Sequence, residues 1–284
     1  YFVDHGRERI GTASTELLVH ARLIAAKGQG FAARADAILN GVMLSPGLRP
    51  GASAEACSQA LAAHLTQQVQ FLTIGKALPN GDVACAAVPP KSRVSIADRN
   101  YFKSALQSRE RVASEVITAR IVGKRVITFA KATRNEDGQV TGVVYLSLDL
   151  AWLQRELASA ALPEGARLVV VDAKGTVAVR HPDPDGWVGR SATHLPLLQR
   201  ILAAGDEGTE EEIGLNGERR LFAYAKLLDT VSGPIYLWLS VPKAVIEAPA
   251  WRAAFFSMGV MLAVFIGTIG LLVWGGNRLV LRHL

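Results

Sequence analysis

The sequence lacks the short motifs that mark most catalytic and metal sites. It has no GxSxG turn, no HExxH pair and no Walker loop. Its six histidines are scattered, and the one local cluster, from His181 to Asp185, matches no spacing typical of metal ligands. We therefore expect this segment not to be an enzyme, and to hold no cofactor and no metal.

Long runs of one charge and low-complexity tracts are also missing. The net charge of +6 is spread along the chain without a cluster of lysines or arginines that could follow a nucleic-acid backbone. This distribution argues against nucleic acid as a partner. Charged residues are plentiful outside one stretch near the C-terminal end, so the length predicts two folded domains of ordinary size.

That one stretch, Ala253–Trp274, has no charged side chain. As a helix it would be roughly 33 Å long, enough to cross a hydrocarbon core of about 30 Å. The alternative is a buried core helix, which rarely stays apolar on every face over such a length. We expect a transmembrane helix over 251–275, with residues 1–250 outside and the C-terminus cytoplasmic, because Arg278 and Arg282 follow the span. This arrangement requires an upstream signal or a first membrane helix that ends just before the first residue.

Only two cysteines are present, Cys57 and Cys85. An even number of cysteines in an oxidising compartment predicts a disulfide. A bridge that closes a loop of about 28 residues would stabilise the fold by ~3–4 kcal/mol. The alternative is two separate buried thiols.

The region 1–52 carries a repeat of seven residues that predicts one long helix, from Glu8 to about Leu44. The apolar positions of the repeat are Ile10, Leu17, Ile24, Phe31 and Ile38, and mostly small residues stand four positions after each of them. This seam can pack on the chain's own domains, or on the same helix of a second copy in a homodimer. We expect both.

Two α+β units follow, residues 53–162 and 163–248. They share one order of elements: two strands, a helix and three antiparallel strands joined by short turns. Matching segments recur at a nearly constant offset, such as Lys124–Thr133 with Glu218–Leu227. A common offset indicates an internal repeat, and the predicted fold class is α+β.

The stretch Ala97–Leu106 carries the candidate binding residues. Asp98 is a suitable helix N-cap, and Tyr101 and Phe102 begin an inward-facing pattern. This pattern leaves Arg99 unexplained. An arginine at the mouth of a half-open sheet can bind a carboxylate through two hydrogen bonds. The alternatives for Arg99 are an ion pair with Asp98 or a position on the surface.

Several of these residues carry a resemblance to a known family. The neighbouring pairs Asp98–Arg99 and Tyr101–Phe102, and the segment Leu148–Leu153 after the last strand of the first unit, resemble the double Cache sensor. This sensor is a tandem PAS-like input module of bacterial transmembrane receptors. The order of a long helix, two units and an exit helix is similar as well, so the resemblance covers nearly the whole chain.

The resemblance implies a bacterial inner-membrane protein whose sensor region is periplasmic. In that family the ligand binds in the membrane-distal unit, which is 53–162 here, and the unit 163–248 is membrane-proximal. The implied ligand-binding set is Asp98, Arg99, Tyr101, Phe102 and the acidic position Asp149.

The tail 276–284 resembles the start of a HAMP-type signalling helix, although Arg282–His283 stands where that family usually has Arg-Pro. The resemblance implies a cytoplasmic output domain outside this sequence, either a diguanylate cyclase or a histidine kinase. The alternatives are the sensor domain of a chemoreceptor, and a membrane-anchored scaffold that dimerises without a small-molecule ligand.

One departure from the family concerns the ligand. The amino-acid-binding branch has Arg-x-Trp-Tyr followed two residues on by Asp, whereas Arg99–Phe102 reads Arg-Asn-Tyr-Phe here and Ser104 stands at the last position. The set that binds an α-amino group is therefore incomplete, and we expect a small organic acid held by Arg99. The second unit matches this stretch only at Gly186–Ser191, which keeps an arginine but loses the aromatic pair, so we expect that unit to act mainly as a transmitter.

Overall fold

The computed structural model describes residues 2–49, 51–159, 162–182, 185–193, 196–214, 217–246, 258–270 and 274. Within this part of the chain, no helix is both long enough and apolar enough to cross a membrane. The expected transmembrane helix falls only partly on described residues, of which 258–270 are helical with exposed side chains. The expected HAMP-like tail, 276–284, lies outside the described residues.

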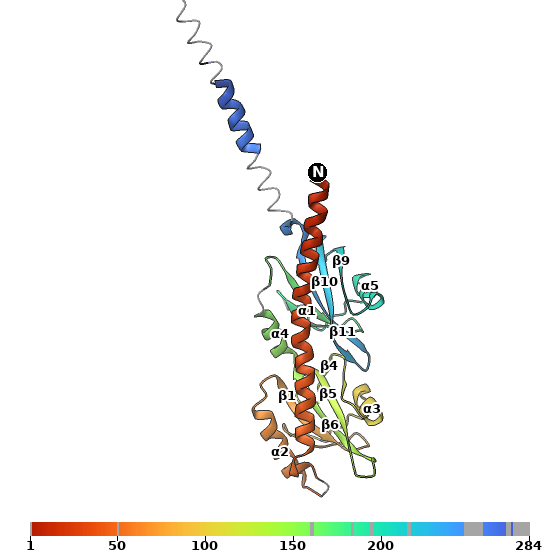
Figure 1. Cartoon of the computed structure of the whole chain (residues 1–284). Helices are drawn as coiled ribbons and strands as arrows, with labels where there is room; N and C mark the ends of the chain where they lie inside the picture. Colours follow the sequence, from red (N-terminus) through yellow and green to blue (C-terminus); the bar gives the residue numbers. More distant parts are fainter. Residues whose placement is uncertain are drawn as a thin grey trace, which may run out of the picture.

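The helix α1, Phe2–Met43, is 42 residues long and runs beside two α+β units (Figure 1). A short 3-10 helix, Pro46–Leu48, follows it. The first unit contains two helices and six strands, in the order α2 (Ala54–Thr66), β1 (Phe71–Ala77), β2 (Val83–Ala86), α3 (Asn100–Gln107), β3 (Val112–Ala113), β4 (Ile117–Thr118), β5 (Arg125–Arg134) and β6 (Val140–Asp149). The helix α4 (Leu150–Ala158) follows β6 and leads into the second unit, which consists of β7 (Arg167–Val171), β8 (Val177–His181), α5 (Pro196–Ala204), β9 (Glu207–Ile213), β10 (Arg219–Thr230) and β11 (Gly233–Pro242).

Each unit is built on one antiparallel sheet, and the two sheets share a topology. The strand order is β2-β1-β6-β5-β3 in the first unit, with β4 also pairing with β5, and β8-β7-β11-β10-β9 in the second. The predicted α+β class, the long helix and the antiparallel repeat are thus confirmed.

The first of the three antiparallel strands expected after the helix of the first unit is interrupted in the structure. The Ser114 hydroxyl accepts a hydrogen bond from the backbone N–H of Thr128 at 2.8 Å, and Val116 N–H turns away to donate to the Asp172 carboxylate at 3.2 Å. A side chain therefore takes the place of a backbone acceptor in the ladder, and the segment splits into β3 and β4.

Side chains alternate between the two faces of each strand. On β6, Val144, Leu146 and Leu148 join a core shared with α1, α2 and α4, whereas Val143 and Tyr145 belong to a separate cluster beneath α3. The second sheet repeats this division, with α5 on the face away from α1. Figure 1 shows α2 and α4 on one side of the molecule, with α3 and α5 on the other.

The heptad seam of α1 packs on the chain's own sheets, which is one of the two expected arrangements. Ala21 and Ala35 are fully buried, and Phe31 packs edge-on against Trp152 of α4, with ring centroids 5.1 Å apart. A Cβ on Gly28 would lie 2.3 Å from Cδ1 of Leu227 on β10, so the glycine leaves room for this leucine side chain against α1. The opposite side of α1 exposes Leu23.

Cys57 of α2 and Cys85 of β2 form a disulfide whose Cα atoms are 6.0 Å apart. The bridge ties α2 to a four-residue strand at the edge of the first sheet. Such an edge strand has few ladder bonds of its own, so the covalent link contributes much of what holds β2 in place.

The two units contact each other directly through the segment between β3 and β4. Lys174 of the second unit forms an ion pair with Glu115 at 2.5 Å, and Val231 N–H donates to Ala113 O at 2.9 Å. Burial opposes ionisation of Glu115, but the hydrogen bond and charge of Lys174 outweigh it, so the pKa of this carboxyl lies below its usual value.

Candidate ligand-binding site

Three hydroxyl side chains lie side by side on the face of the first sheet that is covered by α3. Thr73 of β1 pairs in register with Ser147 of β6, and Ser147 pairs with Thr128 of β5. The Thr128 and Ser147 hydroxyls are 3.0 Å apart and hydrogen-bonded, and all three residues are buried. Polar side chains in the middle of three buried strands form a floor that can donate hydrogen bonds to a ligand.

Tyr145 lies two residues before Ser147 on the same face of β6. Its phenol oxygen is buried and has no hydrogen-bond partner among the described residues. Gly75 stands opposite it on β1, and a Cβ there would lie 2.2 Å from the phenol oxygen. Gly75 therefore makes room for the tyrosine, whose unpartnered hydroxyl is costly to bury and available to a ligand.

The rim of the site is formed by the start of α3 and by the segment around β4. Arg99 is the N-cap residue of α3, and its guanidinium donates to Thr118 O at 3.0 Å. Asp98 was expected to be the N-cap, which is wrong. Its carboxylate instead accepts two hydrogen bonds from Arg120, both at 2.7 Å. These hydrogen bonds hold the pKa of Asp98 below its ordinary value.

The space enclosed between floor and rim is small. The cavity offers about 20 Å³ to the centre of a water-sized sphere, which is enough for roughly one water molecule. Its lining comprises Thr73, Val94, Ile96, Arg99, Tyr101, Ile117, Thr118, Ala119, Arg120, Ile121, Thr128, Tyr145 and Ser147. The structure therefore shows a closed site with a polar floor and two arginines at its rim.

A family model described as a Cache domain matches residues 7–250 of this sequence. The chain belongs to the Cache domain family. The match includes α1 and both sheets, so the resemblance seen in the sequence is confirmed over nearly the whole chain.

Several solved sensory domains share the fold of this Cache chain. The extracellular domain of rpHK1S-Z16, described as a histidine kinase, has a TM-score of 0.69 at 19% identity, covering 82% of this chain and 96% of its own. The ligand-binding domain of the Campylobacter jejuni chemoreceptor Tlp3, in complex with L-norvaline, has a TM-score of 0.66 at 16% identity, covering 84% and 94%. That of the Pseudomonas fluorescens chemoreceptor CtaA, in complex with L-isoleucine, has a TM-score of 0.66 at 20% identity, covering 86% and 97%. No curated protein is similar enough to this chain to count as a match.

The structure of this Cache chain brings some of the sequence-predicted site residues together and separates others. Arg99 and Tyr101 line the cavity, and Asp98 lies just outside it, paired with Arg120. Phe102 is buried in the cluster beneath α3 without lining the cavity. Asp149 caps α4 by accepting from Ala151 N–H at 2.9 Å, which places it at the junction with the second unit.

The floor of the Cache site was missed by reasoning from the sequence. Thr73, Thr128 and Ser147 are short polar residues inside otherwise apolar strands, and Tyr145 also lies within such a strand. A signal did exist, because each of these hydroxyls interrupts a run of buried apolar residues. Only the strand registers show that the three hydroxyls are neighbours.

The acid–base behaviour of Tyr101 provides a test of this closed Cache site. Burial raises the pKa of Tyr101 to about 12, compared with ~10 for an exposed phenol. The folded state therefore holds this proton more tightly than the unfolded state, and the stabilising contribution is lost as pH rises from about 10 towards 12. Phenolate absorbance of the parent minus that of Tyr101→Phe should titrate near pH 12. A difference that titrates near 10 would show that Tyr101 is solvent-exposed.

Proposed function

We propose that this Cache chain is the extracytoplasmic ligand-sensing region of a bacterial receptor, and that its ligand binds between the first sheet and α3. The observation that supports this most directly is the polar floor of Thr73, Ser147 and Thr128 beside the unpartnered phenol of Tyr145. A protein that served only as a scaffold would have no use for buried hydroxyls facing a cavity, because each polar group costs free energy to bury.

The proposed ligand is a small organic acid. Arg99 and Arg120 stand at the rim, and no acidic residue occurs among the described residues that line the cavity. The matched chemoreceptor domains are complexes with amino acids. In this cavity the α-ammonium group of an amino acid would meet no carboxylate among the described lining residues. This agrees with the sequence, which has Ser104 where the amino-acid-binding branch of the family has aspartate. A carboxylate without an ammonium group fits this charge distribution better.

Ligand binding must open the site, because the closed cavity holds about one water. Two contacts keep the rim shut: Arg99 to the backbone of Thr118, and Arg120 to Asp98. A carboxylate would compete for both guanidinium groups. We propose that the carboxylate binds both Arg99 and Arg120 and thereby displaces the segment around β4.

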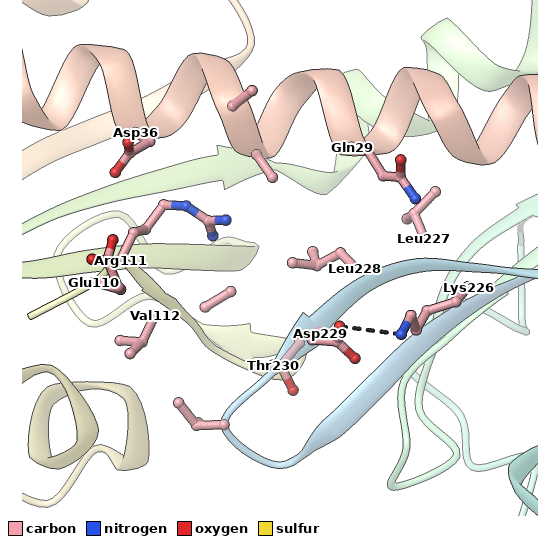
Figure 2. Close-up of a pocket in the computed structure, with 14 residues that line it drawn as sticks. Gln29, Asp36, Glu110, Arg111, Val112, Lys226, Leu227, Leu228, Asp229 and Thr230 are labelled. Carbon is pink, nitrogen blue, oxygen red and sulfur yellow. Dashed lines mark ion pairs between the residues drawn. The ribbon is translucent and has the colours of Figure 1, made fainter. Parts of the chain in front are cut away.

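The same segment provides a route for the signal. Ile117–Ile121 contributes to the cavity, and the residues just before it, Glu115 and Val116, bond to Lys174 and Asp172 of the second unit. Figure 2 shows a cleft between α1, the β3 region and β10, with Asp36 and Arg111 beside it and Lys226 paired with Asp229. This cleft of about 740 Å³ leaves space for the units to shift relative to one another and to α1.

We further propose that the segment 253–274 crosses the inner membrane, with the sensor region periplasmic and the C-terminus cytoplasmic. Its described part, 258–270, exposes large apolar side chains such as Phe265 and Met261 to the surroundings, which suits lipid better than water. The exposed Val19 and Leu23 on α1 are one turn apart and favour a homodimer. The output domain would be a diguanylate cyclase or a histidine kinase, with a chemoreceptor as the alternative.

The proposal is tested by calorimetry of the full chain in detergent micelles against a panel of small mono- and dicarboxylates. Arg99→Ala should weaken binding of any active acid at least ~10-fold, the effect of losing about 1.4 kcal/mol from a charged hydrogen bond. Arg93→Ala is the matched control, because Arg93 is exposed on the same loop and pairs with Asp82 outside the cavity. No heat from any acid, or equal affinity in both variants, would contradict the proposed site.

A further inference from the structure

A cavity of about 990 Å³ lies beside the first sheet, near the C-terminal end of α1. Its walls come from the 3-10 helix and the loop into α2, from β1 and β2, from the turn between β5 and β6, and from the loop after α3. The lining comprises Met43, Gly47, Leu48, Arg49, Gly51, Ala52, Ala54, Cys57, Lys76, Leu78, Ala84, Cys85, Arg109, Ala132, Thr133, Arg134, Asn135, Gly138 and Thr141. Figure 1 shows α2 at the end of the molecule away from the second sheet. The cavity shares no lining residue with the closed one beneath α3.

One positively charged side chain of this cavity, that of Lys76 on β1, is half-buried. Its ammonium group donates a hydrogen bond to Leu48 O at 3.0 Å, and this acceptor is neutral. Burial lowers the pKa of Lys76, whereas a neighbouring carboxylate would raise it. Because an ammonium group has three donors, Lys76 can bind a ligand and keep its bond to Leu48.

Two hydroxyl side chains lie close to Lys76. Thr141 of β6 donates to Thr133 Oγ1 of β5 at 3.0 Å, and both residues line the cavity. A Cβ on the neighbouring Gly142 would lie 3.4 Å from Thr133 Oγ1 and 3.6 Å from Cε of Lys76. Since glycine has no Cβ, no side chain separates the lysine from the hydroxyls at this point. Three adjacent strands, β1, β6 and β5, thus bring an ammonium group and two hydroxyls together.

The lining of this cavity contains four basic residues and no acidic one among the described residues; the basic ones are Arg49, Lys76, Arg109 and Arg134. Arg134 donates to three backbone carbonyls, at 3.0, 3.2 and 3.3 Å, and these acceptors are neutral, like that of Lys76. Four acidic residues adjoin the lining in sequence, but they are exposed and outside it: Glu55, Glu110, Glu136 and Asp137. A cavity lined by charge of one sign attracts ligands of the opposite sign.

The kinds of donor indicate which anion fits. Lysine binds phosphate as a point charge, and arginine binds it through its planar fork. Here the donors belong to separate elements, since Lys76 and Thr133 lie on strands whereas Arg109 lies on the loop after α3. A tetrahedral group that carries two charges offers oxygens in all these directions, whereas a planar carboxylate offers two in one plane. Apolar side chains such as Met43 and Leu78 complete the wall and can contact an organic body.

We propose that this cavity is a second binding site of the first unit, for a phosphate monoester with an apolar body. Its phosphate group binds to Lys76 and to the hydroxyls of Thr133 and Thr141, and Arg109 contacts it from the rim. The body packs against the apolar part of the wall. This site is separate from the one beneath α3 and does not depend on the organic acid proposed to bind there.

Phenyl phosphate is a suitable probe, with phenol as its neutral counterpart and benzoate as a planar anion of one charge. Calorimetry on the full chain in detergent micelles should show binding of phenyl phosphate and at least ~10-fold weaker binding of phenol and of benzoate. No heat from phenyl phosphate would overturn the proposal. Affinity for phenol or benzoate equal to that for phenyl phosphate would overturn it as well.

Substitutions of basic residues locate the phosphate group. Lys76→Met removes the charge and keeps an apolar stem, and it should weaken phenyl phosphate at least ~10-fold, as expected for a charged hydrogen bond. Arg109→Gln, at an exposed position, should weaken it about 3-fold. Lys103→Gln is the matched control, because Lys103 is exposed on α3 and outside the lining, and it should leave the affinity unchanged. Equal affinities in all three variants would contradict the proposed site.

A blocking variant keeps the test decisive if Lys76→Met fails to fold. Ala52 is exposed on the loop before α2 and lines the cavity, so Ala52→Trp should fill the entrance, abolish binding and leave the melting temperature close to that of the parent. Arg99→Ala should not change the affinity for phenyl phosphate, which separates this site from the one beneath α3. Binding that survives Ala52→Trp, or that is lost in Arg99→Ala, would refute the second site.

Discussion

Replacing Gly81 by alanine is expected to lower the free energy of unfolding by about 3–5 kcal/mol. Gly81 has a φ of +89°, and a Cβ there would lie 2.5 Å from the Cα of Ala97 and 2.6 Å from its backbone nitrogen. A left-handed conformation costs an alanine ~1–2 kcal/mol, and a clash with backbone cannot be relieved by turning a side chain. The neighbouring chain would have to move, which places the change among the most destabilising single substitutions.

Gly138→Ala is the matched control for this prediction. Gly138 has a similar φ of +80°, but a Cβ there would meet nothing within 4 Å. Its replacement should therefore cost only the ~1–2 kcal/mol of the strained backbone. Thermal or denaturant unfolding of the two variants gives the comparison. Equal losses would mean that Ala97 is not held against Gly81.

The same substitution should affect the ligand site, because Gly81 O accepts a hydrogen bond from Ile96 N–H at 2.8 Å. This bond fixes the loop that leads into Asp98 and Arg99. The Gly81→Ala chain should therefore bind its organic acid more weakly than the Gly138→Ala chain, measured at a temperature where both variants are folded.

Removing the disulfide is expected to cost about 2–4 kcal/mol, since the bridge closes a loop between residues with a sequence separation of 28. Cys57 and Cys85 are both buried, so alanine is the appropriate replacement at each. The loss should be concentrated in α2 and β2, where hydrogen exchange of the backbone amides should accelerate. Unfolding of the double variant Cys57→Ala/Cys85→Ala reports the size of the effect.

Reductant supplies the internal control for the disulfide. It should destabilise the parent to about the level of the double variant and leave the double variant unchanged. If the parent unfolds cooperatively and reductant does not change its free energy of unfolding, the two thiols are not bridged.

Much of the fold followed from patterns along the sequence. The period of seven in α1 and the nearly constant offset between the two units can be recognised in the sequence without knowledge of the tertiary structure. The break between β3 and β4 could not be read in this way. It depends on a hydrogen bond from Thr128 to Ser114 and another from Val116 to Asp172, and the second joins residues in different units.

The site was predictable only at its rim. Arg99 stood out because a guanidinium beside an aromatic pair has no routine role at the start of a helix. The hydroxyls of Thr73, Thr128 and Ser147 are unremarkable one at a time, and they form a site only when three strands are aligned.

The alternation of side chains along β6 and β11 has a consequence for how such a chain can evolve. Leu146 and Leu237 occupy corresponding places on the face towards α1, and both are fully buried leucines. One residue further along, on the opposite face, Ser147 in one unit corresponds to Trp238 in the other. After an internal duplication, the two copies could thus diverge in what they recognise without touching the surface that holds the protein together. The face of each sheet that lies away from α1 can therefore change in sequence while the face that packs on α1 stays the same.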